Sequence, residues 1–433
     1  MMNESVSEIP GHNTLNITAR HDLLPPAGQS NMTPLDRSIE KRRLRKHYIL
    51  NIIRQKPGLS RAEISKAAGM NLPSVSTLID ELLNQGLAYE EDARRSARGR
   101  RPTPIYLQSD AASVLGIDIG KHSTMAILMN LGSAPITTLE RLTPPLTTTQ
   151  DYADWAITIA ESIFEQYPQE PPPLCGIGVA LPGLISETAC EDDAPDAQEP
   201  TGNIRCLSAN QIKRALKTRF GVEALVDNDA RIMVPGAHWF HTDHPTGKNF
   251  VVFNIGLGMG IGVCENGRIL SGTHGFSGEL GHSPLGDPDI LCYCGNYGCL
   301  ENVASGLGIQ RMAQERGLPA NDVQELADLA RDGGKEAQAI FKKFASALGR
   351  GIAVTINLYN PETVILSGKV SMAADVFIDD LKAAVARHTL QPILERTRIH
   401  IESPQKNLSS LGAVAIVFHS IFYSGNVSFA EIM

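Results

Sequence analysis

The chain has 433 residues, enough for two or three domains, and 42% of them are hydrophobic, enough to form well-developed cores. It has no run of 18 apolar residues, which excludes a conventional transmembrane helix. Its first 30 residues lack the basic start and apolar stretch of a signal peptide. We therefore expect a cytoplasmic protein with no membrane partner.

The net charge of −8 argues against nucleic-acid binding by the chain as a whole, but the charge is unevenly distributed. Residues 36–101 carry a net charge of +7, and the remaining residues together carry −15. A basic module attached to an acidic body is the asymmetry expected when one end of a chain contacts phosphates. Charge alone leaves a solvated basic helix as the alternative.

Residues 1–33 have no hydrophobic periodicity and predict a flexible tail. Three helices are expected next, over about 35–55, 60–68 and 71–85, with Leu44, Tyr48, Ile49, Ile52 and Ile53 on one stripe of the first. The second begins with a capping box formed by Ser60 and Glu63. The third has one apolar face, made of Val75, Leu78, Ile79 and Leu82.

The tight turn at Gly69 gives the second and third helices the spacing of a helix-turn-helix, whose later helix enters the major groove of DNA. Residues 87–89 and 105–107 predict two strands around an arginine-rich loop, which together form a β-wing suited to a minor groove. The candidate DNA contacts are Arg61, Asn71, Ser74, Ser76, Thr77, Arg98, Arg100 and Arg101. A helical bundle used for protein contacts is the alternative.

From residue 113 onwards, short β-rich runs alternate with helical stretches and glycine-rich turns, which predicts an α/β domain. The expected strands include 114–119, 174–180, 250–255 and 363–366. The acidic segment 186–200 predicts a surface loop, and no repeat of 20–50 residues is visible.

Three of the seven cysteines are packed into eight residues, Cys292, Cys294 and Cys299, and His282 precedes them. An odd number of cysteines without a signal peptide argues against a disulfide framework, whereas three thiolates and an imidazole suit tetrahedral zinc. Because all four positions come from protein, the predicted zinc is structural. Three reduced thiols in a glycine-rich loop are the alternative.

At these residues the chain resembles the ROK family of repressors, open reading frames and sugar kinases, and specifically its repressor branch, which includes glucose-, N-acetylglucosamine- and xylose-type repressors. The resemblance spans about residues 35–425 and rests on residues 116–120, Leu181-Pro182-Gly183, Asn228-Asp229-Ala230, residues 278–282, Cys299-Leu300-Glu301, Asn360-Pro361 and Ser367-Gly368. It implies a two-lobed, actin-like fold with a sugar in the cleft. The sugar site implied by motif consists of Gly183, Asn228, Asp229, Glu279, His282 and Glu301, with the histidine both binding zinc and facing the sugar.

The chemistry of these residues agrees with that implication, because carboxylates and an amide around a small pocket can bind the hydroxyl groups of a sugar. Without the motifs, Asp229 and Glu279 would be interpreted as ordinary surface acids. One family feature is missing: Leu207 stands near the place where a tryptophan is expected, so the sugar itself stays unnamed, and a phosphosugar or another polyol remains open.

Two substitutions in the phosphate-binding loops argue against kinase activity. Lys121 stands where the kinases of the family have a glycine, and Leu257 stands where they have a threonine between two glycines. A side chain at the first position blocks the approach of backbone amides to phosphate, and the second position has lost a hydroxyl. Asp229, the general base that the family resemblance implies, is kept. We predict a non-enzymatic sensor; an ATP-dependent sugar kinase with a fused DNA-binding domain is the alternative, and a docking protein for a protein partner is a third.

The predicted organisation is a tail (1–33), a winged helix-turn-helix (34–108) and a two-lobed sugar-sensing domain (113–433) with a zinc loop at 282–299. The predicted function is a sugar-responsive repressor of carbohydrate-utilisation genes. It would bind a pseudo-palindromic operator as a homodimer or a dimer of dimers. Whether the ligand weakens or strengthens DNA binding is left open.

Overall fold

The computed structural model describes residues 34–91, 102–167, 171–187, 206–240, 247–320, 322–403 and 405–424. The flexible tail, the arginine-rich part of the wing and most of the acidic loop that the sequence predicts lie outside these residues. No helix among the described residues is long and apolar enough to cross a membrane.

The first helices form the expected winged helix-turn-helix. They are α1 (Pro34–Gln55), α2 (Arg61–Ala68) and α3 (Leu72–Asn84), followed by the antiparallel strands β1 (Ala88–Glu90) and β2 (Ile105–Leu107). The predicted capping box of Ser60 and Glu63 is present, and Gly69 ends α2 in the left-handed conformation. The buried face of α3 is the predicted set of Val75, Leu78, Ile79 and Leu82.

The buried surface of α1 differs from the predicted stripe. Tyr48 is 37% exposed, whereas His47, Leu50 and Asn51 are buried. A single stripe suits one packing partner, whereas α1 shares its apolar core with both the rest of the winged helix and the C-terminal helical segment.

The first lobe of the body is built on a five-stranded sheet in the order β5-β4-β3-β6-β9. These strands are β3 (Ser113–Ile119), β4 (Ser123–Asn130), β5 (Pro135–Leu142), β6 (Leu174–Leu181) and β9 (Ala224–Asn228). β3, β4 and β5 are antiparallel neighbours, and β6 and β9 run parallel to β3. Helices α4 (Thr149–Gln166) and α5 (Ala209–Phe220) pack on one face, and the short parallel pair β7 (Leu184–Ser186) and β8 (Cys206–Ser208) lies beside α5.

The second lobe repeats this topology in a sheet ordered β12-β11-β10-β13-β14. Its strands are β10 (Phe250–Ile255), β11 (Met259–Glu265), β12 (Arg268–Ile269), β13 (Thr363–Ser367) and β14 (Arg398–Ile401). Its helices are α7 (Gly306–Glu315), α8 (Val323–Arg331), α9 (Lys335–Tyr359), α10 (Ala374–His388) and α11 (Gln391–Leu394). The matching strand orders show an internal duplication of the fold that the sequence did not reveal.

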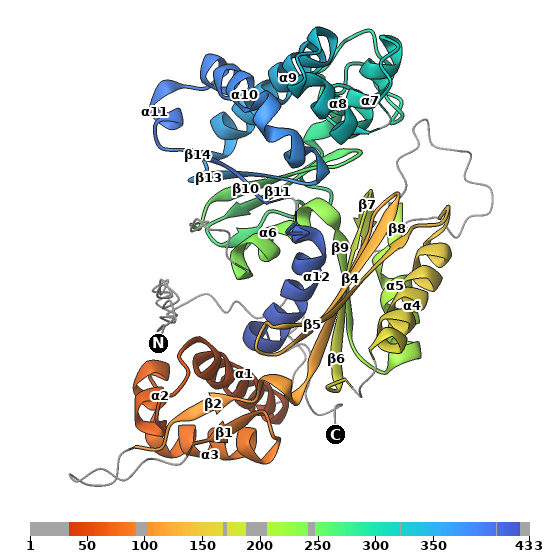
Figure 1. Ribbon diagram of the computed structural model, residues 1–433. Helices are drawn as coiled ribbons and strands as arrows, with labels where there is room; N and C mark the ends of the chain where they lie inside the picture. The colour runs from red at the N-terminus through yellow and green to blue at the C-terminus, as the bar shows by residue number, and fades with distance from the viewer. Residues whose placement is uncertain are drawn as a thin grey trace, which may run out of the picture. The chain divides into compact units, whose positions relative to one another are not determined.

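Helices α6 (Asp229–Trp239) and α12 (Leu408–His419) lie between the two sheets (Figure 1). α12 packs on β3 and β6 of the first sheet, while α6 packs on β10 and β11 of the second, and the two helices contact each other. A Cβ atom on Gly178 would overlap the carbonyl oxygen of Ala413, and one on Gly412 would overlap that of Ile232. Glycine at both positions therefore permits this close packing of backbones.

Residues 44–433 form one compact unit. A single apolar core includes Ile49 and Ile53 of α1, Val114 of β3, and Phe418 and Phe422 of the C-terminal segment. The winged helix beyond Arg43 therefore shares its core with the first lobe, although the sequence suggested two separately packed domains.

Candidate ligand cleft, metal centre and DNA-binding face

Two acidic side chains lie where the helices between the sheets begin. Asp118 belongs to β3, and Asp229 is the first residue of α6. Asn407, the N-cap of α12, donates a hydrogen bond to Asp118 Oδ2 (3.1 Å), and Asn254 of β10 donates one to Asp229 Oδ2 (3.1 Å). Ser409 Oγ donates to the backbone oxygen of Asp229 (3.2 Å), so α12 is tied directly to this acidic pair.

Both carboxyl groups have raised pKa values. Burial raises the pKa of Asp118 to about 6. Burial, followed by the negative charge of Asp118, raises the pKa of Asp229 to about 7. A carboxyl group that is only partly ionised near neutral pH can either donate or accept a hydrogen bond, which suits a ligand rich in hydroxyl groups.

The neighbouring polar groups come from the ends of strands. Asn228 ends β9 and caps α6, and its side chain donates to the carbonyl oxygen of Gly183 (3.0 Å). Gly183 has a φ of +87°, a conformation that favours glycine at the start of β7. These contacts join Gly183, Asn228 and Asp229 into one group, as the family motifs imply.

The other half of the cleft comes from the second lobe. Glu279 precedes a short 3-10 helix, η3 (Leu280–His282), which ends at His282, and Glu301 lies in another, η4 (Leu300–Asn302). Glu301 is 5% exposed and accepts a hydrogen bond from the amide of Met259 (2.7 Å). Burial, with a contribution from the Glu301 charge, raises the pKa of Glu279. The negative charge of Glu279 also contributes to the raised pKa of Asp229, so the carboxyl groups from the two lobes are close enough to interact.

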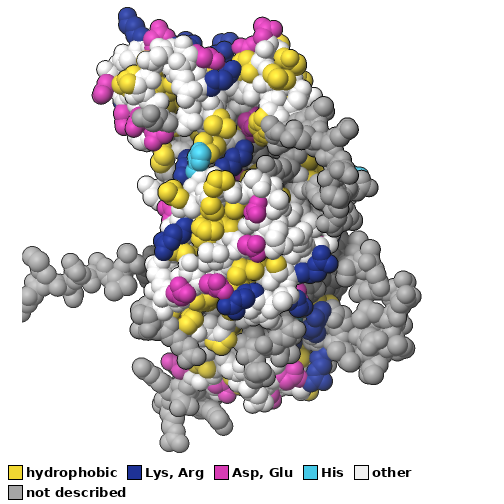
Figure 2. Space-filling model, turned by 90° about the vertical axis from the view of Figure 1, so that its right-hand side faces the viewer, with side chains coloured by type: hydrophobic (Ala, Val, Ile, Leu, Met, Phe, Trp, Pro, Cys, Tyr) yellow, Lys and Arg dark blue, Asp and Glu magenta, His cyan; other side chains and the backbone are white. Residues whose placement is uncertain are grey.

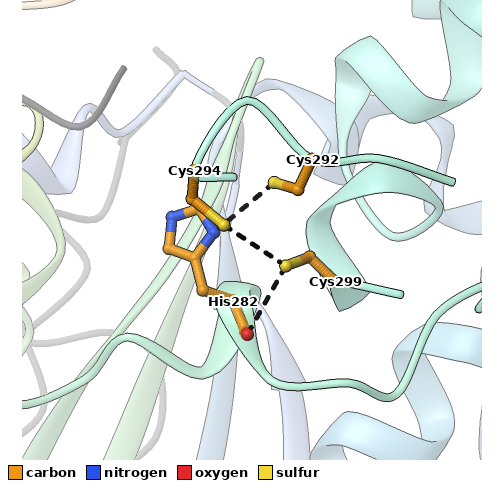
Figure 3. Close-up of side chains that lie close together, drawn as sticks. All are labelled: His282, Cys292, Cys294 and Cys299. Atoms are coloured by element: carbon orange, nitrogen blue, oxygen red, sulfur yellow. Dashed lines mark hydrogen bonds between the residues drawn. The ribbon is translucent and has the colours of Figure 1, made fainter. Parts of the chain in front are cut away.

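The predicted metal ligands converge on one point (Figure 3). The ligand atoms of His282, Cys292, Cys294 and Cys299 all lie within 4.8 Å of one another. Cys292 Sγ lies 3.7 Å from His282 Nδ1, and the sulfurs of Cys294 and Cys299 are 3.5 Å apart. A tetrahedral zinc ion with Zn–S bonds of about 2.3 Å places its ligands about 3.8 Å apart, so these residues fit the ion.

The local backbone and charges also fit zinc. Gly295 and Gly298 have φ values of +90° and +75°, which allow the loop to fold back as the sequence predicts. Burial lowers the pKa of His282, which favours the neutral imidazole that a metal needs. Cys175 and Cys264 are free thiols buried elsewhere, and Cys206 is disulfide-bonded, which the sequence argument did not anticipate.

Tyr293, which sequence reasoning did not select, lies between two metal ligands and faces the cleft residues. Its hydroxyl lies 3.4 Å from His282 Nε2, the ring nitrogen opposite the metal-facing Nδ1. Burial and the negative charge of Glu301 raise the pKa of this hydroxyl well above its usual range. The ammonium group of Lys121, from the turn between β3 and β4, lies 5.1 Å from the centre of the Tyr293 ring.

Residues 256–258, which the family resemblance assigns to the second phosphate loop, connect β10 and β11. Backbone atoms of this segment form hydrogen bonds within the protein. The amides of Gly306 and Leu307, at the start of α7, donate to the carbonyl oxygens of Gly256 (2.8 Å) and Leu257 (3.1 Å). The amide of Gly256 itself donates to Gly258 (3.1 Å).

On the DNA-binding face, the predicted residues divide into several roles. Asn71 caps α3 by accepting from the amide of Ser74 (2.9 Å), and Thr77 is exposed with its hydroxyl donating to Pro73. Arg61 forms ion pairs with Asp80 (2.7 Å) and Glu90 (2.9 Å), and also donates to the carbonyl oxygen of Ser76 (3.4 Å). These bonds give Arg61 a role inside the winged helix.

Arg98, Arg100 and Arg101 lie outside the described residues. Leu72, which was not predicted, is 46% exposed at the first turn of α3. On the face drawn in Figure 2, basic, acidic and hydrophobic side chains are interspersed rather than gathered into patches of one kind.

Sequence reasoning selected candidate residues that belong to local motifs and did not select those outside such motifs. Asn254, Asn407 and Ser409 have no motif around them, and they reach the site only because α12 returns to the first sheet. Asp118 belonged to a recognised motif but was not selected as a site residue.

These features define a winged-helix module fused to a two-lobed sugar-kinase-like body. A model of the ROK family matches residues 114–420, and one of the MarR family matches residues 43–99. The chain belongs to the ROK family.

The chain matches curated relatives over nearly their full length. The chain is 26% identical to the xylose repressor of Caldicellulosiruptor bescii, covering 87% of this chain and 96% of the relative. It is 28% identical to the xylose repressor of Bacillus subtilis (88% and 96%) and 26% identical to the DNA-binding transcriptional dual regulator NagC of Escherichia coli (91% and 96%).

Solved structures agree on the fold. A ROK family transcriptional regulator, a homologue of the Escherichia coli MLC protein, matches with a TM-score of 0.73 at 23% identity over 90% of this chain and 99% of the other. A ROK family glucokinase from Streptomyces griseus in complex with glucose and AMPPNP matches with a TM-score of 0.58 at 21% identity, over 70% and 98%.

Proposed function

We propose that this protein is a sugar-responsive transcription regulator, a repressor of carbohydrate-utilisation genes that binds a pseudo-palindromic operator as a dimer. The xylose repressors of Caldicellulosiruptor bescii and Bacillus subtilis match 87% and 88% of this chain, and the MarR family model matches residues 43–99, within the winged helix. A winged helix reads a short half-site, so two copies related by a two-fold axis would supply the specificity of an operator.

The observation that carries the proposal is the course of α12. Its N-terminal residues bond to Asp118 and Asp229, and its C-terminal end continues into a π-helical turn, η6 (Ser420–Ser424), that packs on α1. His47 Nδ1 of α1 donates to the carbonyl oxygen of Ile421, and Gln55 Nε2 donates to the Tyr423 hydroxyl (3.0 Å). One helix therefore contacts both the candidate ligand cleft and the DNA-binding module.

In this proposal, the ligand is a sugar held by Gly183, Asn228, Asp229, Glu279, His282 and Glu301. Carboxylates and the Asn228 amide would bind its hydroxyl groups. A structural zinc ion bound by His282, Cys292, Cys294 and Cys299 would fix the loop that carries the sugar-facing residues. When bound, this zinc supplies rigidity rather than reaction chemistry, because all four of its positions are filled by protein.

The proposed DNA contacts are α3 in the major groove and the wing arginines in the minor groove. Asn71 is the N-cap of α3, Thr77 is exposed in its second turn, and Leu72 would contact a thymine methyl group. Arg98, Arg100 and Arg101 would contact the backbone and the minor groove.

The test measures operator affinity with and without sugar. An operator is first selected from random DNA, and a sugar is selected by thermal shift. Wild type should change its operator affinity when sugar is added, and Asp229→Ala should not. Asp379→Ala, which removes an exposed carboxylate from α10, is the matched control and should behave like wild type. A sugar response that persists in Asp229→Ala would refute the proposed cleft.

An ATP-dependent sugar kinase is the second candidate, favoured by one observation. A carboxyl group with a pKa of about 7, as in Asp229, suits a general base near neutral pH. Against it, the family resemblance puts Lys121 and Leu257 at positions where the kinases have a glycine and a threonine. A coupled assay with ATP, magnesium and sugar decides between them; sugar-dependent ATP consumption would establish the kinase.

A further inference from the structure

Tyr293 makes, within the protein, the contacts that a sugar hydroxyl would make. Its hydroxyl group lies 3.4 Å from His282 Nε2, and the negative charge of Glu301 acts on it. Both residues belong to the proposed sugar site: His282 begins the zinc loop, and Glu301 follows it in sequence. The phenol therefore lies beside one ring nitrogen and within the electrostatic influence of one carboxylate.

The ring of Tyr293 is held from two directions. The imidazole of His282 lies 5.4 Å away at an interplanar angle of 81°, an edge-to-face arrangement. Lys121, from the first lobe, places its ammonium group 5.1 Å from the ring centre, within the range of a cation–π interaction. Because Tyr293 comes from the second lobe, this contact spans the cleft.

We propose that Tyr293 is a specificity-determining residue that occupies a ligand-hydroxyl position of the sugar site and must leave it when the ligand binds. Lys121 holds it in place from the opposite lobe. This inference rests on the proposed sugar site. It assigns to the lysine in the first phosphate-loop position a function that a glycine there could not perform.

A second tyrosine on the same loop, Tyr297, has different surroundings and provides a comparison for Tyr293. Tyr297 is 61% exposed, and its described contact is a backbone bridge with Leu291. Tyr293 is 38% exposed, yet its polar atom faces the cleft. The two residues therefore form a matched pair for mutation: same loop, same residue type, different surroundings.

The consequence for ligand binding is a competition. A sugar reaches His282 and Glu301 only in the fraction of molecules in which Tyr293 has left them, and the observed affinity is reduced by that fraction. Removing the hydroxyl group leaves the ring in place but removes the polar contact with His282 that competes with the sugar. Tyr293→Phe should therefore bind sugar more tightly, by roughly three- to tenfold, the range that one hydrogen bond contributes.

The experiment compares four full-length proteins: wild type, Tyr293→Phe, Lys121→Met and the control Tyr297→Phe. Calorimetric titration with a panel of aldoses and aldose phosphates gives the dissociation constants. Hydrogen exchange of residues 286–301 and 118–125, without ligand, reports whether the contact across the cleft holds these segments. Zinc content verifies that each variant keeps its metal.

The expected result is tighter binding and faster exchange in both Tyr293→Phe and Lys121→Met, with Tyr297→Phe unchanged. Weaker binding in Tyr293→Phe would overturn the proposal, because it would mean that the hydroxyl binds the ligand directly; unchanged binding would overturn it as well. If none of the four proteins binds a sugar but exchange is faster in Tyr293→Phe and Lys121→Met, the contact between Lys121 and Tyr293 is supported and the proposed sugar function is refuted. Unchanged exchange without sugar binding would refute both.

Discussion

The guanidinium group of Arg54, in the last turn of α1, lies 4.4 Å from the centre of the Trp239 ring, at the last residue of α6. It also lies 5.1 Å from the ring of Phe422, next to α12. Both α6 and α12 begin at the Asp118–Asp229 pair, so Arg54 contacts the far ends of two helices that start at the proposed ligand site. Coupling between sugar and DNA requires an element that contacts both sites, and this aromatic cluster is placed to provide it.

Arg54→Met is expected to reduce the coupling between sugar and operator. The variant keeps the aliphatic length of the side chain but loses the cation–π contacts, which should lower the free energy of unfolding by on the order of 1 kcal/mol. The ratio of operator dissociation constants with and without sugar should move toward one, since that ratio measures the coupling free energy.

The matched control is Arg219→Met. Its guanidinium group lies 5.3 Å from the Phe220 ring at the end of α5, a helix that packs mainly on α4 and β9. It should leave the ratio unchanged. If Arg54→Met is destabilised but keeps the full ratio, the cluster is a structural contact without a part in signalling.

Cys294→Ala is expected to abolish metal binding. Three ligands would remain for an ion that requires four, and the loop that carries Glu301 would lose its anchor. Elemental analysis of protein purified without added metal should give about one zinc per chain for wild type and almost none for the variant. Cys264→Ala removes a buried thiol outside the cluster and should keep its zinc. A wild-type protein free of zinc, when fresh and reduced, would contradict the assignment.

Arg100→Ala combined with Arg101→Ala is expected to weaken operator binding and flatten its dependence on salt. Each phosphate contact contributes about −0.9 to the slope of log affinity against log salt, so losing two should reduce the slope by about 2. Arg396→Ala with Arg398→Ala removes the same charge from exposed positions on the body and should leave the slope intact. Equal slopes for the wing variant and wild type would rule out the wing contacts.

Local sequence signals predicted the winged helix well. The capping box at Ser60 and the apolar face of α3 depend on residues three or four positions apart, and both are found. The cluster of candidate metal ligands was equally accessible, because its four residues fall within an 18-residue segment. In these cases, the residues that act together are neighbours in the chain.

The remaining features depend on contacts between distant parts of the chain. His47 is buried because it bonds to Ile421, 374 residues later, and no periodicity within α1 could indicate this. Asn407 reaches Asp118 across 289 residues. Tyr293 acquires its surroundings only when Lys121 of the other lobe meets it. The family motifs pointed to the candidate carboxylates, but no sequence motif indicated the residues that form hydrogen bonds with them.

Asp229→Asn is expected to raise the stability of the folded protein at neutral pH. Burial, with the charge of Asp118, raises the pKa of Asp229 to about 7, whereas an unfolded chain has an aspartate pKa of about 3.9. Between these values, the folded state keeps a proton that the unfolded state has released, so the free energy of unfolding falls as pH rises from about 4 to 7. An uncharged amide escapes this fall. The variant should therefore melt at a higher temperature than wild type at pH 7.5 and at nearly the same temperature at pH 4.

Asp151→Asn provides a control of opposite sign. Hydrogen bonds from the amides of Thr147 and Thr148 lower the pKa of Asp151 to about 2, where it caps α4. Its ionised form therefore stabilises the protein above pH 4, and this contribution is lost as pH falls toward 2. Asp151→Asn should melt below wild type at pH 7.5, with a difference that shrinks in acid. If Asp229→Asn also melts below wild type at pH 7.5, the carboxylate is held by favourable bonds rather than strained by burial. Asp229 would then stabilise the fold. The hypothesis that the carboxylate lowers stability and is kept because it binds a ligand would be refuted.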